Sequence, residues 1–178
     1  MVTIVLLHDV MSSQVEFRRN QRDLEDLGYK VIALDLPGHG GRLVVAGSAN
    51  SLDSMALDVA GRLDESVAHL VVGHSLGAIV GLRLARLRPG LVSGVLLEDP
   101  PGMASNDASR VAAEVARAVL RARVDPHGEV TKLLMEGSSW TRDTAEDAIR
   151  SRQLVDVPAV VRFLRSHRFA SSLIPLEA

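Results

Sequence analysis

The chain of 178 residues contains no cysteine, and only 3% of its residues are aromatic. The absence of cysteine excludes disulfides, a thiol nucleophile and any cysteine-ligated metal site. Because aromatics are scarce, the core must be built from aliphatic side chains, which a hydrophobic content of 47% supplies. A chain of this length is typical of one domain with a substantial core.

An excess of one charge and long apolar runs are also lacking. Twenty Lys and Arg residues are balanced by 22 Asp and Glu residues, so we expect no nucleic acid and no membrane surface as a partner. The apolar start "MVTIVLLHD" is too short to span a bilayer, and it lacks the basic flank and cleavage site of a signal peptide. We therefore interpret it as a strand and expect a cytoplasmic protein.

Short apolar runs alternate with helical patterns over the first 100 residues. The runs "VTIVLLH", "KVIALDL", "HLVVG" and "VSGVLLE" are almost continuously apolar, which is typical of strands buried on both faces. Ser13 and Glu16 predict a capping box for a helix that ends at Gly28, and apolar stripes predict helices over 52–63 and 76–87. The alternation predicts a three-layer α/β/α fold with a mainly parallel sheet.

Residues after Pro101 show helical patterns and no convincing strand. Valine stripes, and a cap formed by Thr144 and Asp147, contribute to four predicted helices in this region. We therefore divide the chain into an α/β core, residues 1–101, and a helical cap or flank, residues 102–178.

The stretch "VVGHSLGAIVGLRLARL" places a serine on a sharp corner. A G-x-S-x-G pattern lies between a buried strand and a helix, which is the setting of a nucleophile elbow. Its residues are Gly73, His74, Ser75, Leu76 and Gly77. A Cβ at either glycine position would collide with the neighbouring strand or helix. The turn presents the serine hydroxyl beside the free N–H groups of the helix start, which suit a developing oxyanion. A plain helix N-cap is the structural alternative.

Four segments in order resemble the α/β-hydrolase superfamily: "IVLLHD" (4–9), "VIALDLPGHG" (31–40), "VVGHSLG" (71–77) and "VSGVLLEDP" (92–100). The resemblance implies that Ser75 is the nucleophile and that the backbone N–H groups of Val10 and Leu76 form the oxyanion hole. It also implies that Asp35 and Gly38 shape the backbone of a turn at the mouth of the site. It covers about the first 100 residues well, and the helical remainder stands in the place of the family's cap.

The chain departs from the family pattern in three ways. The usual His-Gly after the first motif is His8-Asp9 here, so we expect a reshaped oxyanion loop. The sequence also starts at the motif strand and lacks the later strands that carry the family's usual acid and His. We therefore expect a shortened member of the superfamily.

The general base is unknown from the sequence. Structural positions are expected for four of the six histidines, namely His8, His39, His69 and His74. His127 and His167 qualify only if the helical block folds over the carboxyl edge of the sheet. Asp99, just after "VSGVLLE", is the candidate acid, because some members take it from that strand end. An ordinary Asp-Pro turn before a helix is the alternative.

Two functional hypotheses follow. In the first, the chain is a serine hydrolase that acts on small carboxylic esters, thioesters or lactones through an acyl-enzyme at Ser75, with an apolar acyl pocket under the helical block. In the second, it is a truncated or degenerate relative with an incomplete triad and little or no activity. Acyl transfer and cofactor-free haloperoxidase chemistry stay open within the first.

We expect no cofactor and no metal. The sequence has no carboxylate–histidine cluster at ligand spacing and no Gly-rich phosphate loop. A four-stranded sheet without outer strands exposes apolar edges, which favours a homo-oligomer.

Overall fold

A parallel sheet forms the centre of the molecule. The computed structural model describes residues 2–44, 51–101, 108–137 and 140–166. Its four strands pair in parallel in the order β2-β1-β3-β4, and their bounds are β1 (Thr3–Leu7), β2 (Lys30–Leu34), β3 (His69–His74) and β4 (Val92–Glu98). The α/β fold class predicted from the alternating runs is therefore confirmed.

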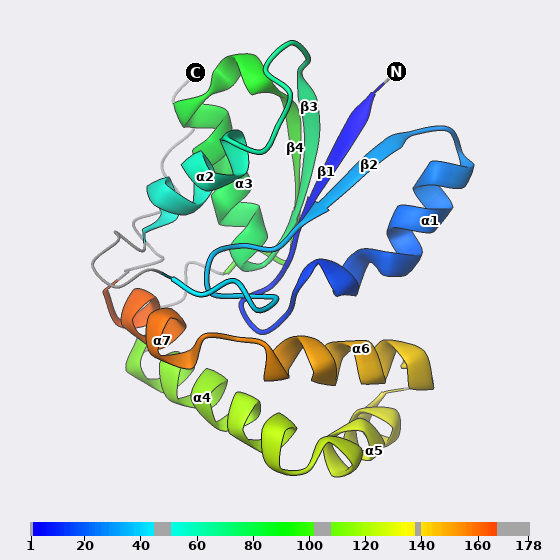
Figure 1. Cartoon of the computed structure of the whole chain (residues 1–178), viewed down its shortest axis with the longest axis vertical. Helices are drawn as coiled ribbons and strands as arrows, with labels where there is room; N and C mark the ends of the chain where they lie inside the picture. Colours follow the sequence, from blue (N-terminus) through cyan, green and yellow to red (C-terminus); the bar gives the residue numbers. More distant parts are fainter. Residues whose placement is uncertain (1, 45–50, 102–107, 138–139, 167–178) are drawn as a thin grey trace.

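Helices cover both faces of the sheet (Figure 1). One face carries α1 (Arg18–Asp26), and the other carries α2 (Leu52–Ala60) and α3 (Leu76–Leu87). Ile4 and Leu6 of β1 belong to the α1-side cluster, whereas Val5 and Leu7 belong to the cluster on the opposite face. All five residues of β1 are buried, which explains why its sequence is continuously apolar.

The start of the first helical segment differs from the prediction. A 3-10 turn, η1 (Gln14–Phe17), precedes α1, and Ser13 caps it by accepting the N–H of Val15. Glu16 does not complete a capping box, because its carboxylate instead contacts His74 and the N–H of Asp9. The capping-box prediction was therefore right for Ser13 and wrong for Glu16.

Four helices form a layer across the carboxyl ends of the strands (Figure 1). They are α4 (Ala108–Val124), α5 (Pro126–Glu136), α6 (Arg142–Gln153) and α7 (Val157–Ser166), and no strand follows β4 among the described residues. The predicted cap of the third helix was wrong, since the N-cap is Thr141 and its hydroxyl pairs reciprocally with Thr144. The division at residues 101 and 102 stays a prediction.

A buried hydrogen bond joins this helical layer to the core. Ser13 Oγ lies 2.7 Å from Ser151 Oγ of α6, and both serines are only 1% exposed. Ser151 Oγ donates its own proton to the carbonyl of Asp147, at 2.8 Å. Since each hydroxyl has one proton, Ser13 must be the donor to Ser151. The contact therefore fixes α6 over the loop that follows β1.

The outer edge of β4 has no strand partner among the described residues. Leu96 is 53% exposed and Leu97 38% exposed on this edge strand. Association of copies through such an edge stays a prediction. Among the helices of the described ranges, none has the length and apolarity needed to cross a membrane.

We predict that Ser151→Ala destabilises the protein by about 1–3 kcal/mol, because it leaves the buried hydroxyl of Ser13 without its acceptor. Urea unfolding followed by circular dichroism measures the change. Ser93→Ala, on exposed β4, is the matched control and should change stability by no more than about 0.5 kcal/mol. Equal unfolding midpoints for the two variants would show that the contact does not hold the layer in place.

Candidate active site

Ser75 occupies a strained turn between β3 and α3. Its backbone angles are φ 51° and ψ −109°, with φ in a region that residues other than glycine rarely adopt. Its N–H donates to the carbonyl of Glu98 on β4 at 2.9 Å. Two residues further on, the N–H of Gly77 donates to the carbonyl of His8 at 3.1 Å. These two bonds fix the turn between the carboxyl ends of β4 and β1.

Steric constraints require glycine at both positions of the pattern, Gly73 and Gly77. A Cβ on Gly73 would lie 2.3 Å from the carbonyl oxygen of Gly77, and a Cβ on Gly77 would lie 2.1 Å from that of Leu7. Both values are far below van der Waals contact. The collision expected from the sequence is therefore confirmed for both positions.

We predict that Gly77→Ala destabilises the protein by about 3 kcal/mol or more, because β1 or α3 must move to admit the methyl group. The free energy of unfolding in urea tests this. Gly90→Ala is the matched control, since no atom lies within 4 Å of the position that its Cβ would take. A loss for Gly77→Ala no larger than that of the control would contradict the close approach of α3 and β1.

The backbone N–H groups of Val10 and Leu76 have no hydrogen-bond acceptor among the described residues. The carbonyl of Asp9 shares a peptide unit with the N–H of Val10, and it accepts from His8 Nδ1 at 2.7 Å and from the N–H of Ser12 at 3.1 Å. Because a trans peptide is planar, holding this carbonyl directs the N–H of Val10 the opposite way. The loop thus leaves this donor free for a ligand.

His8 holds that peptide as a neutral ring. It is fully buried, and its Nε2 accepts the N–H of Leu36 at 3.0 Å, so the proton lies on Nδ1. Burial, with a smaller effect from His39, lowers the pKa of His8 to about 3. The approach of Nε2 to Asp35 at 3.9 Å is therefore not an ion pair at neutral pH.

His39 and Asp9 complete the loop. His39 is buried, which lowers its pKa, and its Nε2 lies 2.8 Å from the carbonyl of Val10. Asp9, in the place of the family's glycine, is not among the described residues with positive φ. Its carboxylate accepts the N–H of Met11 at 3.1 Å. The loop is accordingly formed without left-handed geometry at Asp9.

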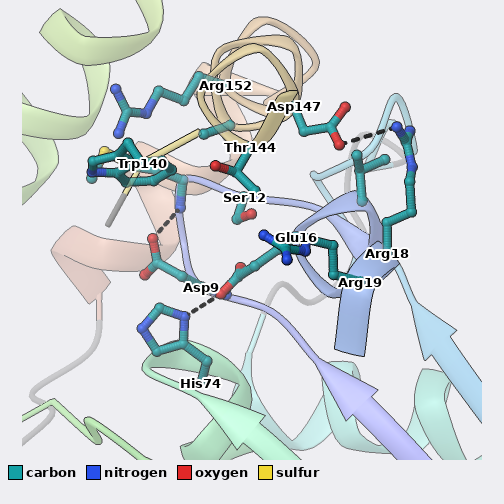
Figure 2. A pocket seen from close by; sticks show the side chains of 13 residues that line it. Asp9, Ser12, Glu16, Arg18, Arg19, His74, Trp140, Thr144, Asp147 and Arg152 are labelled. Atoms are coloured by element: carbon teal, nitrogen blue, oxygen red, sulfur yellow. Dashed lines mark hydrogen bonds and ion pairs between the residues drawn. The ribbon is translucent and has the colours of Figure 1, made fainter. Parts of the chain in front are cut away.

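His74, next to the serine, contacts a different partner. Its Nδ1 lies 2.5 Å from Glu16 Oε1, and the two side chains point toward one another in Figure 2. The hydrogen bond with Glu16 raises the pKa of His74 to about 9, so the ring is charged at neutral pH. A charged imidazole cannot accept the proton of Ser75. No local sequence signal links His74 to Glu16, because 58 residues separate them.

We predict that stability decreases as pH rises from about 6.5 to about 9. The folded pKa of His74 is raised above its ordinary value, so its contribution is fully present below pH 6.5 and is lost as pH passes 9. Titration of the His74 ring by NMR should report a midpoint near 9 in the wild type. In Glu16→Gln the midpoint should move back toward 6.5 and the stability profile should flatten. An unchanged midpoint in that variant would refute the assignment.

A hollow of about 260 Å³ lies between the loop after β1, the end of β3 and α6 (Figure 2). Its apolar lining includes Met11, Val15 and Trp140. Seven ionisable side chains also line it: Asp9, Glu16, Arg18, Arg19, His74, Asp147 and Arg152. Ionisable and apolar side chains thus share the lining of this hollow, and the apolar acyl pocket expected from the sequence stays a prediction.

A second hollow of about 250 Å³ shares Met11 and Arg152 with the first and extends between α4 and α5. Within the described ranges, no group of three or more His, Asp or Glu residues is arranged to hold a metal ion.

No described histidine forms a hydrogen bond with the Ser75 hydroxyl. His69 contacts the carbonyl of Leu91 at the opposite end of β3, and exposed His127 lines neither hollow. His167 lies outside the described residues. The candidate acid, Asp99, is exposed with φ 41°, directly after the residue whose carbonyl accepts from Ser75.

Comparison with known proteins shows the family to which this chain belongs. A profile described as "Alpha/beta hydrolase family" matches residues 4–176. The chain belongs to this family. Among solved structures, the chain is similar in fold to a thermophilic esterase from Thermogutta terrifontis, at 20% identity and a TM-score of 0.70, over 97% of this chain and 64% of that one.

A second similar structure is an epoxide hydrolase from Bacillus megaterium, at 17% identity and a TM-score of 0.69, over 99% of this chain and 72% of that one. A curated relative from Pseudomonas putida, named as the dihydrolipoyllysine-residue acetyltransferase component of an acetoin cleaving system, is 31% identical over 137 residues. That match covers 76% of this chain and 36% of the relative. This α/β hydrolase thus spans little more than a third of the length of that relative.

Proposed function

We propose that this α/β hydrolase is a serine hydrolase that cleaves carboxylic esters, thioesters or lactones, with Ser75 as the nucleophile. The observation that carries the proposal is the backbone of Ser75, held at φ 51° by two glycines and by bonds to β1 and β4. Strained geometry of this kind persists where the surrounding structure enforces it, and it clusters at active sites.

The reaction proceeds through an acyl-enzyme. Ser75 Oγ attacks the carbonyl carbon and forms a C–O bond, and the electron pair of the carbonyl moves onto its oxygen. The N–H groups of Val10 and Leu76, which lack acceptors among the described residues, stabilise this oxyanion. Collapse expels the alcohol or thiol, and water then releases the acid and restores the serine.

The proton of Ser75 requires a base that the described histidines do not supply. His8 is neutral, but its Nε2 is occupied by the N–H of Leu36, and His74 is charged. Asp99 is proposed as the acid of the triad on the basis of its place beside the elbow. The alternative is a degenerate member with little or no activity, and the lack of a base among the described histidines favours it.

The names of the similar proteins guide the choice of reaction. An esterase and an epoxide hydrolase share the fold, and the relative from Pseudomonas putida is named as an acetyltransferase component. Ester cleavage and acyl transfer both pass through an acylated serine, whereas opening an epoxide breaks no acyl bond. The G-x-S-x-G serine therefore favours acyl chemistry.

We predict that a fluorophosphonate probe labels the wild-type chain and fails to label Ser75→Ala, because phosphonylation needs the activated hydroxyl. Peptide mass spectrometry locates the label, and p-nitrophenyl butyrate turnover should decrease at least about 100-fold in the variant. Ser93→Ala, with its serine on an exposed strand, should react like the wild type. Labelling that survives in Ser75→Ala would overturn the proposal, and absence of labelling in both would support the degenerate alternative.

A further inference from the structure

Arg152 extends from α6 beside Trp140 in the wall of the first hollow, on the side away from His74 (Figure 2). It lines both hollows, and it forms no hydrogen bond or ion pair through its side chain with another described residue. Burial lowers the pKa of its guanidinium, although the group stays charged. A partly buried guanidinium without an acceptor loses hydration and gains no partner in return.

Four of the other charged groups in the wall of the first hollow form pairs with one another. Arg18 pairs with Asp147 at 3.0 Å, and His74 pairs with Glu16. These pairs leave Arg152 as a cation without an anion in the wall of the first hollow. Arg19 also lines this hollow and lacks an ion pair among the described residues, but it is more exposed than Arg152.

Neither of the two carboxylates with the strongest electrostatic effect on Arg152 pairs with it. Asp9 accepts from the N–H of Met11, and Glu129 lies 3.1 Å from Arg121 Nε. Both favour the charged guanidinium electrostatically without forming an ion pair with it. Its planar set of N–H donors therefore remains free, and this fork matches a carboxylate bidentately.

We infer that Arg152 binds a carboxylate of the substrate, so that this hydrolase acts on small esters or thioesters that carry a free acid group. The inference rests on the proposed function, because the same hollow is lined by His74, which adjoins Ser75, and by Asp9, which adjoins Val10. The volume of about 260 Å³ is below the range of drug-sized sites, which favours a small acid.

The kinetic test compares an acidic ester with a neutral one of similar size. For the wild type we expect kcat/KM for mono-(4-nitrophenyl) glutarate to exceed that for 4-nitrophenyl pentanoate. Arg152→Met should reduce this preference at least 10-fold, mainly through KM of the acidic ester. Arg150→Met removes an exposed arginine from the same helix and should keep the preference. A preference that persists in Arg152→Met would overturn the inference.

A binding test separates this inference from the role of Ser75. Isothermal titration of Ser75→Ala with monomethyl glutarate should show binding, and adding Arg152→Met should weaken that binding at least 10-fold. Dimethyl glutarate has no free acid, so it should bind Ser75→Ala no more tightly than it binds the double variant. Binding of this kind without turnover in the wild type would support the inference and refute the hydrolase. Turnover without Arg152-dependent binding would refute the inference alone.

Binding of inorganic phosphate and the variant Arg152→Lys provide two further controls. Inorganic phosphate that binds more tightly than monomethyl glutarate would overturn the carboxylate assignment. If Arg152→Met does not fold, Arg152→Lys keeps the charge and removes the planar fork. That variant should weaken binding of monomethyl glutarate several-fold, and unchanged binding would overturn the inference.

Discussion

The close approach of α3 to β1 at Gly77 is the contact on which the rest of the site depends. The glycine leaves no room for a Cβ against the carbonyl of Leu7, and its N–H donates to the carbonyl of His8. This contact sets where α3 begins and therefore where Ser75 turns. It also places the first free amide of the helix, at Leu76, beside the end of β1, because β1 and β3 are paired neighbours in the sheet.

The loop after β1 is fixed by buried groups rather than by glycine. His8 connects the peptide of Asp9 to the N–H of Leu36, and His39 reaches the carbonyl of Val10. A neutral ring is needed for this role of His8, because Nε2 must accept while Nδ1 donates. Burial keeps the ring neutral, and the donor amide at Val10 is thereby held in a fixed orientation without the glycine of the usual family motif.

Local steric patterns could be predicted from the sequence, whereas distant polar contacts could not. The strands, the elbow and the two required glycines follow from apolar runs and from the spacing around Ser75. Glu16 was predicted to cap a helix because three residues separate it from Ser13, but a charged ring 58 residues away provides a stronger partner. The role proposed for Arg152 could not be predicted from the sequence, because the sequence does not distinguish an exposed, paired arginine from a half-buried, unpaired one.

Two histidines at the ends of adjacent strands show how the surroundings decide protonation. His8 on the loop after β1 is neutral because it is buried, and His74 at the end of β3 is charged because Glu16 binds it. The pair formed by His74 and Glu16 carries no net charge, so its field at Ser75 is weaker than that of a free imidazolium. Stabilisation of an oxyanion must then come from the amides, and the unpaired charge of Arg152 is available to hold another part of the substrate. Under the proposed function, charge in this hollow would orient the substrate, while the backbone amides would stabilise the reacting oxygen.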